Sequence, residues 1–94
     1  MGDAALLRSW AVDGNDAAFR QLTDKYINLV FSIALRGVAG GRELAEEVTQ
    51  NVFALLARKA GSLKADPSIS GWLYQTAVLE AKSAARRELK RLEK

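Results

Sequence analysis

The chain contains no cysteine and no histidine. Without cysteine it can form neither a disulfide nor a thiolate metal site, which fits a reducing cytoplasm. Without histidine it also lacks the commonest general base and a common metal ligand. The carboxylates that remain are not paired in an apolar, glycine-flanked setting that would suggest catalysis. We therefore expect a protein that is not an enzyme and that needs no cofactor or metal.

Proline and long apolar segments are also scarce. The only proline is Pro67. No apolar run approaches the roughly 18 residues that a membrane-spanning helix needs. The N-terminus lacks the basic-then-apolar pattern of a signal peptide. These absences predict a cytoplasmic protein without a membrane segment.

The residues that are abundant favour helices. The chain has 94 residues, of which 49% are hydrophobic and 27% charged, and it is rich in Ala, Leu, Glu, Lys and Arg. This composition predicts one small helical domain. Apolar residues recur at steps of three and four, as on the buried face of a helix. We predict an all-α bundle of three long helices and one short N-terminal helix, over about residues 3–12, 16–36, 42–60 and 68–92.

Residues that commonly begin or end helices mark the boundaries. Asp3 is expected to cap the first helix, and either Asn15 or Asp16 the second. Gly37 is placed to end the second helix in the left-handed conformation, and Gly61 to stop the third. Residues 61–68 then form the longest loop. The second helix should bury a stripe made of Phe19, Leu22, Tyr26, Leu29, Val30 and Ile33.

The third predicted helix has two different faces. Its apolar stripe contrasts with an opposite face of carboxylates and amides, which indicates a docking surface for a cationic partner. The helix dipole offers a purely structural explanation for the same charge order, because anions are favoured near the start and cations near the end. The apolar stripe consists of Leu44, Val48, Val52, Leu55 and Leu56, and the polar face of Glu43, Glu47, Gln50 and Asn51.

Charge is unevenly distributed along the chain. Residues 1–57 hold five cations and seven anions, a net charge of −2, whereas residues 58–94 hold nine cations and four anions, a net charge of +5. Two partners of opposite charge would suit this division. A solvated basic helix, paired within itself through Glu80, Glu88 and Glu93, remains an alternative.

Several segments, in order, resemble region 2 of bacterial sigma factors, in the extracytoplasmic-function (ECF) subgroup of the sigma-70 family. Residues 45–53, AEEVTQNVF, match the subgroup's acidic and Gln-containing segment, and residues 72–77, WLYQTA, match its Trp-Leu segment. The likeness extends over nearly all of the chain, through residues 15–19, the positions Tyr26, Leu29 and Val30, and the basic pair Arg86-Arg87. The subgroup's second domain, the region 4 helix-turn-helix, has no counterpart in these residues.

The resemblance implies a transcription initiation factor domain with two binding surfaces. The third helix would dock on the β′ coiled coil of core RNA polymerase, through Glu46, Glu47, Gln50, Asn51 and Phe53. The loop at 61–70 and the fourth helix would recognise or melt the minus-ten promoter element by holding its non-template strand as single-stranded DNA, with one base flipped into a pocket. The implied DNA-binding residues are Lys59, Ser62, Lys64, Asp66, Ser68, Ser70, Tyr74, Gln75, Lys82, Arg86 and Arg87.

One departure from the family pattern and two alternatives bear on this interpretation. Where the subgroup often has Ala-Arg-Asn, this chain has Ala77-Val78-Leu79. The loss of two polar side chains favours an alternative, a sigma-like module that binds a regulator such as an anti-sigma factor without reading DNA. A duplex-DNA binder with a basic recognition helix is a further alternative, but the 61–68 connection is too long for the turn it needs. Trp10 and Trp72 are expected to belong to the core.

Overall fold

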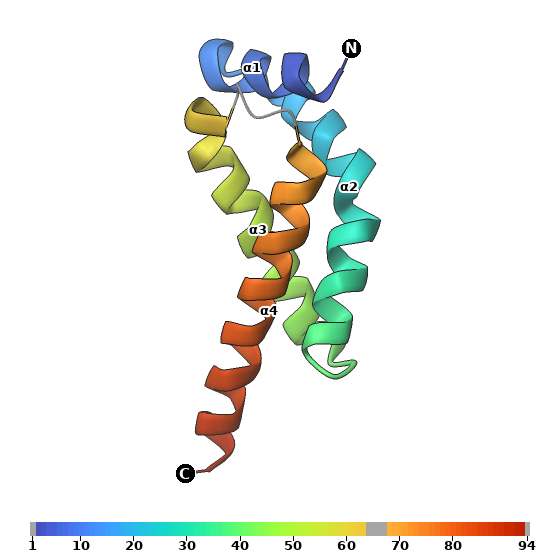
Figure 1. Cartoon of the computed structure of the whole chain (residues 1–94), viewed down its shortest axis with the longest axis vertical. Helices are drawn as coiled ribbons and strands as arrows, with labels where there is room; N and C mark the ends of the chain where they lie inside the picture. Colours follow the sequence, from blue (N-terminus) through green and yellow to red (C-terminus); the bar gives the residue numbers. More distant parts are fainter. Residues whose placement is uncertain (1, 64–67, 94) are drawn as a thin grey trace.

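Four helices make up nearly all of the chain that the structure describes. The computed structural model describes residues 2–63 and 68–93. It contains α1 (Asp3–Asp13), α2 (Asp16–Gly37), α3 (Arg42–Leu63) and α4 (Ile69–Leu92), with no strand in these two ranges (Figure 1). The predicted all-α bundle of three long helices and one short N-terminal helix is confirmed. Within the same ranges no helix combines the length and apolar character that crossing a membrane requires.

The three long helices pack side by side, and α1 lies across one end of them (Figure 1). α3 contacts all three of the other helices, and α2 packs extensively against α4. Each long helix turns one apolar stripe inward, and burying a leucine there stabilises the fold by about 1.5–3 kcal/mol. The largest fully buried side chains are Leu7, Leu22, Leu56, Leu73, Val30, Val48 and Val52.

Leu29 does not belong to the buried stripe of α2, contrary to the prediction. It is 40% exposed, whereas its neighbour Val30 is fully buried. The buried positions of α2 are Ala18, Leu22, Val30, Ile33 and Ala34. One residue along a helix is a rotation of about 100°, so the position next to Val30 turns away from the core.

Two side chains fasten α1 to the rest of the bundle. The Asp3 carboxylate accepts a hydrogen bond from Lys25 Nζ at 2.8 Å and another from the Tyr26 hydroxyl. Trp10 Nε1 donates to the carbonyl oxygen of Ala57 in α3 at 3.0 Å. The prediction that Asp3 caps α1 is wrong, because Gly2 occupies the N-cap position without a side-chain bond. The carboxylate instead bonds to α2.

The crossing of α2 and α4 depends on Gly37. A Cβ atom at this position would lie 2.5 Å from the Cβ of Ala81, so only glycine lets the two backbones approach this closely. The prediction that Gly37 ends α2 in the left-handed conformation is wrong. Gly37 is helical, and the positive φ angles of the turn belong to Ala39 at 55° and Gly40 at 82°.

α3 continues past Gly61, where it was predicted to stop. Ala60 is fully buried and Leu63 packs against the core. Burial of these two side chains outweighs the cost of about 1 kcal/mol for a glycine inside a helix. α3 therefore takes in residues 61–63 of the predicted loop.

Candidate functional surfaces

The first half of α3 presents a polar face to solvent. Glu43, Glu46, Glu47 and Gln50 are all exposed, while Ala45, Val48 and Val52 on the opposite side are buried. Among the described residues, none of these three glutamates forms an ion pair. This face therefore carries carboxylates that no cation of the described ranges neutralises in an ion pair.

A groove between α2 and α3 borders one side of this face. Glu46 and Gln50 line it from α3, opposite Ile27, Asn28 and Phe31 of α2. Ile27 is 40% exposed, and the Arg42 guanidinium lies 5.5 Å from the centre of the Phe31 ring. Such a cation–π contact contributes about 0.5–1 kcal/mol at an exposed site and holds the arginine against the ring. Apolar surface thus adjoins the carboxylates.

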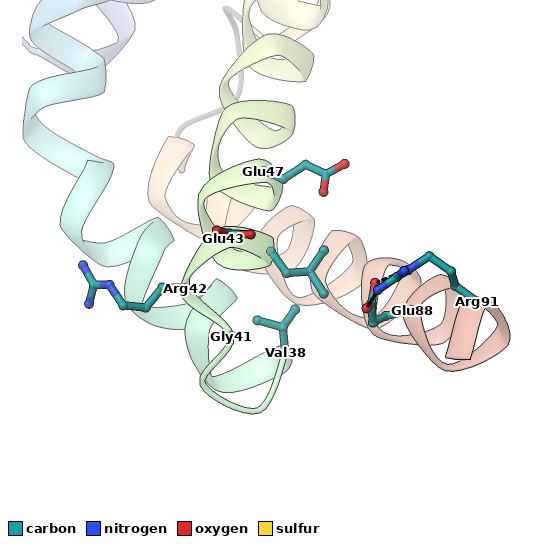
Figure 2. Close-up of a pocket in the computed structure, with 8 residues that line it drawn as sticks. Val38, Gly41, Arg42, Glu43, Glu47, Glu88 and Arg91 are labelled. Carbon is teal, nitrogen blue, oxygen red and sulfur yellow. Dashed lines mark hydrogen bonds and ion pairs between the residues drawn. The ribbon is translucent and has the colours of Figure 1, made fainter. Parts of the chain in front are cut away.

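A second groove borders the other side of the face, toward α4. Figure 2 shows Glu43 and Glu47 on α3 beside Glu88 and Arg91 of α4, with Arg42 directed away from them. Arg91 bonds to both carboxylate oxygens of Glu88. This hydrogen bonding lowers the pKa of Glu88 and raises that of Arg91. Arg91 is therefore paired with Glu88 within α4. The alternative of a basic helix that is paired within itself predicts such a pair, and it holds for this one cation.

Phe53 does not lie on the polar face. It is only 7% exposed and belongs to the core, so little of its side chain is accessible to a partner, and its contact with polymerase stays a prediction. α3 is packed against three helices, and the apolar stripe that such a helix needs is wider than a single line of residues. Asn51 is half-buried, at the edge of the exposed face.

The residues assigned to DNA binding fall on the end of α3 and along α4. Lys59 and Ser62 are exposed on the last turns of α3, and Ser62 Oγ donates to the Lys59 carbonyl oxygen at 3.0 Å. Lys64 and Asp66 lie outside the described residues. The structure exposes the remaining assigned residues on and just before α4: Ser68, Ser70, Tyr74, Gln75, Lys82, Arg86 and Arg87.

Ser68 has a defined structural role at the start of α4. It is the N-cap residue, and its Oγ accepts a hydrogen bond from the Gly71 amide at 3.1 Å. A Cβ at position 71 would lie 2.7 Å from that oxygen. Gly71 therefore leaves room for the cap, which stabilises a helix by about 1 kcal/mol. This bond uses one lone pair of the Ser68 hydroxyl, and the assignment of Ser68 to DNA binding stays a prediction.

Trp72 and Trp10 pack against the core, half-buried, as expected. Tyr74, by contrast, is 54% exposed. Together with Lys82 it lines a groove shared with α2, whose Arg36 the sequence does not assign to any site. No local sequence pattern marks Arg36 as a site residue, because it lines one groove with Lys82 only where α2 and α4 pack together.

The family model described as sigma-70 region 2 matches residues 22–91 of this chain. These 70 residues include α3, nearly all of α4 and most of α2, and therefore every surface described above. The comparisons with curated proteins and with solved structures returned no match.

Proposed function

We propose, since this chain belongs to the sigma-70 region 2 family, that it binds core RNA polymerase through the exposed polar face of α3 and holds melted minus-ten DNA along α4. Domains of this family act in RNA polymerase binding and promoter melting. The assignment to the ECF subgroup, the β′ coiled coil as the docking partner and the residue roles are parts of the proposal.

The exposed, unneutralised face of α3 is the observation that carries the polymerase-binding part. Glu47 and Gln50 are exposed one helical turn apart, and neither is engaged in an ion pair of the described residues. An arginine-rich partner can donate charge-assisted hydrogen bonds to such acceptors, which fixes its register on the helix. The apolar groove beside Gln50, with Ile27 and Phe31, offers area to bury in the same contact.

The test is a pull-down of core RNA polymerase, or of its isolated β′ coiled coil, by the wild-type chain and by Glu47→Ala/Gln50→Ala. We expect the double variant to bind at least tenfold more weakly, because a hydrogen bond to a charged group contributes about 1.5–3 kcal/mol. Asp13→Ala is the matched control. It removes one exposed carboxylate from the C-terminal end of α1, away from α3, so it should leave binding unchanged. Because an anion is unfavourable at that end of a helix, the change should not lower stability. Equal binding by a folded double variant and the wild type would refute the docking surface.

The DNA-binding part is supported by the exposed cations of α4. Lys82, Arg86 and Arg87 are exposed, and among the described residues no ion pair engages them. Cations in this arrangement suit the phosphates of a strand, and exposed Tyr74 provides a ring on which a base can stack.

Exposed apolar surface on α4 favours a second candidate, a module that binds an anti-sigma factor without reading DNA. Leu79 is 63% exposed, at a position where the ECF pattern often has a polar residue. A protein partner would bury this side chain. Polymerase binding by the wild type without any affinity for single-stranded DNA would favour this candidate over the first.

A further inference from the structure

A small apolar groove lies where the turn between α2 and α3 meets the last turns of α4. It is lined by Val38, Ala39 and Leu44 on one side and by Ala85 and Leu89 of α4 on the other. Its volume is about 250 Å³. Leu89 is 63% exposed, so the α4 wall of the groove remains largely open to solvent in the single chain.

The end of α4 that borders this groove is itself an amphipathic helix. Ala85, Leu89 and Leu92 recur at steps of four and three and so form one apolar stripe. Leu92 is 65% exposed, and the last turns of α4 extend beyond the other helices (Figure 1). Groove and stripe share Ala85 and Leu89. The same end of the molecule therefore carries both an apolar groove and an apolar helix end that can fill such a groove in a second copy.

The charges of α3 and of the end of α4 are complementary. Residues 43–57 hold three carboxylates and no cation, a net charge of −3, whereas residues 82–93 hold five cations and two carboxylates, a net charge of +3. Glu43 and Glu47 line the adjoining groove toward α4 (Figure 2). Both are exposed, and neither forms an ion pair among the described residues. An acidic rim therefore lies next to the apolar groove.

The basic end of α4 leaves these carboxylates unpaired in its own chain. Arg87 and Lys90 are exposed and form no ion pair within residues 2–63 and 68–93, and Arg91 pairs with Glu88 of the same helix. In a two-fold pair each copy gives its basic helix end to the other and receives the same contact in return. Complementary charge of this kind orients two surfaces and fixes their register.

We infer that two copies of this chain pair antiparallel through the ends of α4. Each copy lays Leu89 and Leu92 along the apolar groove of the other and sets its cations against the other's Glu43 and Glu47. A contact of this length buries less than the roughly 1,200 Å² of a standard interface, so the pair is weak, with a dissociation constant on the order of 0.1 mM. Below that concentration the chain is a monomer and the end of α4 is open.

The pair also covers part of the polar face of α3. Glu47 belongs both to this contact and to the proposed polymerase-binding face, so a paired chain cannot present it to polymerase. Self-association therefore competes with polymerase binding at high concentration. Only this competition rests on the proposed function, because the pairing follows from the groove, the helix end and their charges.

The experiment is sedimentation equilibrium of the full chain between about 0.01 and 1 mM, a range that brackets the expected dissociation constant. The acid-reversed variant is Glu43→Lys/Glu47→Lys, the base-reversed variant is Arg87→Glu/Lys90→Glu, and Leu89→Gln removes apolar contact. All five positions are exposed, and circular dichroism with thermal unfolding checks that each variant is folded. Asp24→Lys and Arg20→Glu, which reverse exposed charges on α2, are the matched controls.

We expect the wild type and both controls to form dimers, and the acid-reversed variant, the base-reversed variant and Leu89→Gln each to pair about tenfold more weakly or less. An equal mixture of the acid-reversed and base-reversed variants should dimerise again. In the mixed pair the basic end of one copy meets the natural carboxylates of the other, and the reversed end meets the reversed face, so both contacts join opposite charges. A merely destabilised variant would not be rescued by its opposite.

Three results would overturn the pairing. They are a wild type that stays monomeric at the highest concentration, dimers that form equally well in all the variants, and a mixture that fails to recover. An assembly larger than a dimer would contradict a closed two-fold pair.

The competition is tested with the isolated β′ coiled coil at a chain concentration above the dissociation constant of the pair. Leu89→Gln should then bind the coiled coil more tightly than the wild type does, and equal binding would refute the competition. If neither protein binds the coiled coil while the wild type still pairs, the polymerase-binding part of the proposed function fails and the pairing stands.

Discussion

At the scale of single residues, Asp3 shows how the charge of one side chain contributes to the stability of the fold. Burial acts to raise the pKa of its carboxyl, but the hydrogen bonds from Lys25 and Tyr26 and the charge of Lys25 outweigh burial and bring the pKa below 3.8. The same bond raises the pKa of Lys25. The charged form of Asp3 is therefore favoured by folding, and folding is favoured by that charge.

We predict that Asp3→Asn lowers the free energy of unfolding by about 1 kcal/mol at neutral pH, the usual size of a partly exposed charged hydrogen bond. Because the folded pKa is depressed, this contribution is present above the ordinary carboxyl pKa of 3.8 and is lost as pH falls below it. Urea unfolding across the acid range should show the two proteins converging as the carboxyl protonates. Asp24→Asn, an exposed carboxylate without an ion pair among the described residues, is the control. A difference that is the same at all pH values would contradict the prediction.

At the scale of helices, Gly37 and Ala81 decide how closely α2 and α4 pack. Gly37→Ala should destabilise the fold, because its Cβ would lie 2.5 Å from that of Ala81, and both atoms are fixed to helical backbones. Ala81→Gly alone should cost about 1 kcal/mol through helix propensity. In the combination Gly37→Ala/Ala81→Gly the added methyl group occupies the space that the other position vacates. We therefore predict that the double variant is more stable than the sum of the single effects implies, and a double-mutant cycle by urea unfolding measures this. Additive effects would show that the contact does not set the packing.

The same pair of helices shows what the sequence could and could not predict. Apolar spacing of three and four residues reveals the helices because it is local, and the all-α bundle follows from it. Three features depend on which helix lies opposite, and no local pattern in the sequence contains that information. They are the close helix approach at Gly37, the bonding of Asp3 to α2 and the burial of Phe53. The exposed face of α3 was predictable, since carboxylates and amides recur there on one side of a single helix, whereas the roles of its residues remain predictions.

At the scale of the whole molecule, packing is uneven along the long axis. The bundle measures 46 × 21 × 20 Å, and the last turns of α4 extend beyond the other helices (Figure 1). At one end α1 is held by Trp10 and Asp3. At the other end Leu92 is 65% exposed, and the ion pair of Glu88 with Arg91 lies within α4 itself. An isolated stretch of helix is marginally stable, so the two ends should differ in how readily they open.

We predict that backbone amides of α4 beyond Glu88 exchange with solvent much faster than those around Leu73, which is fully buried. Substitutions should follow the same gradient. Leu92→Gln should change the free energy of unfolding by less than about 0.5 kcal/mol, whereas Leu73→Ala should cost about 2–5 kcal/mol through the cavity it leaves. Hydrogen exchange read by NMR, with urea unfolding of the two variants, tests both statements. Protection beyond Glu88 equal to that at Leu73 would mean that a surface absent from this fold covers the end of α4, and Leu92→Gln would then remove that protection.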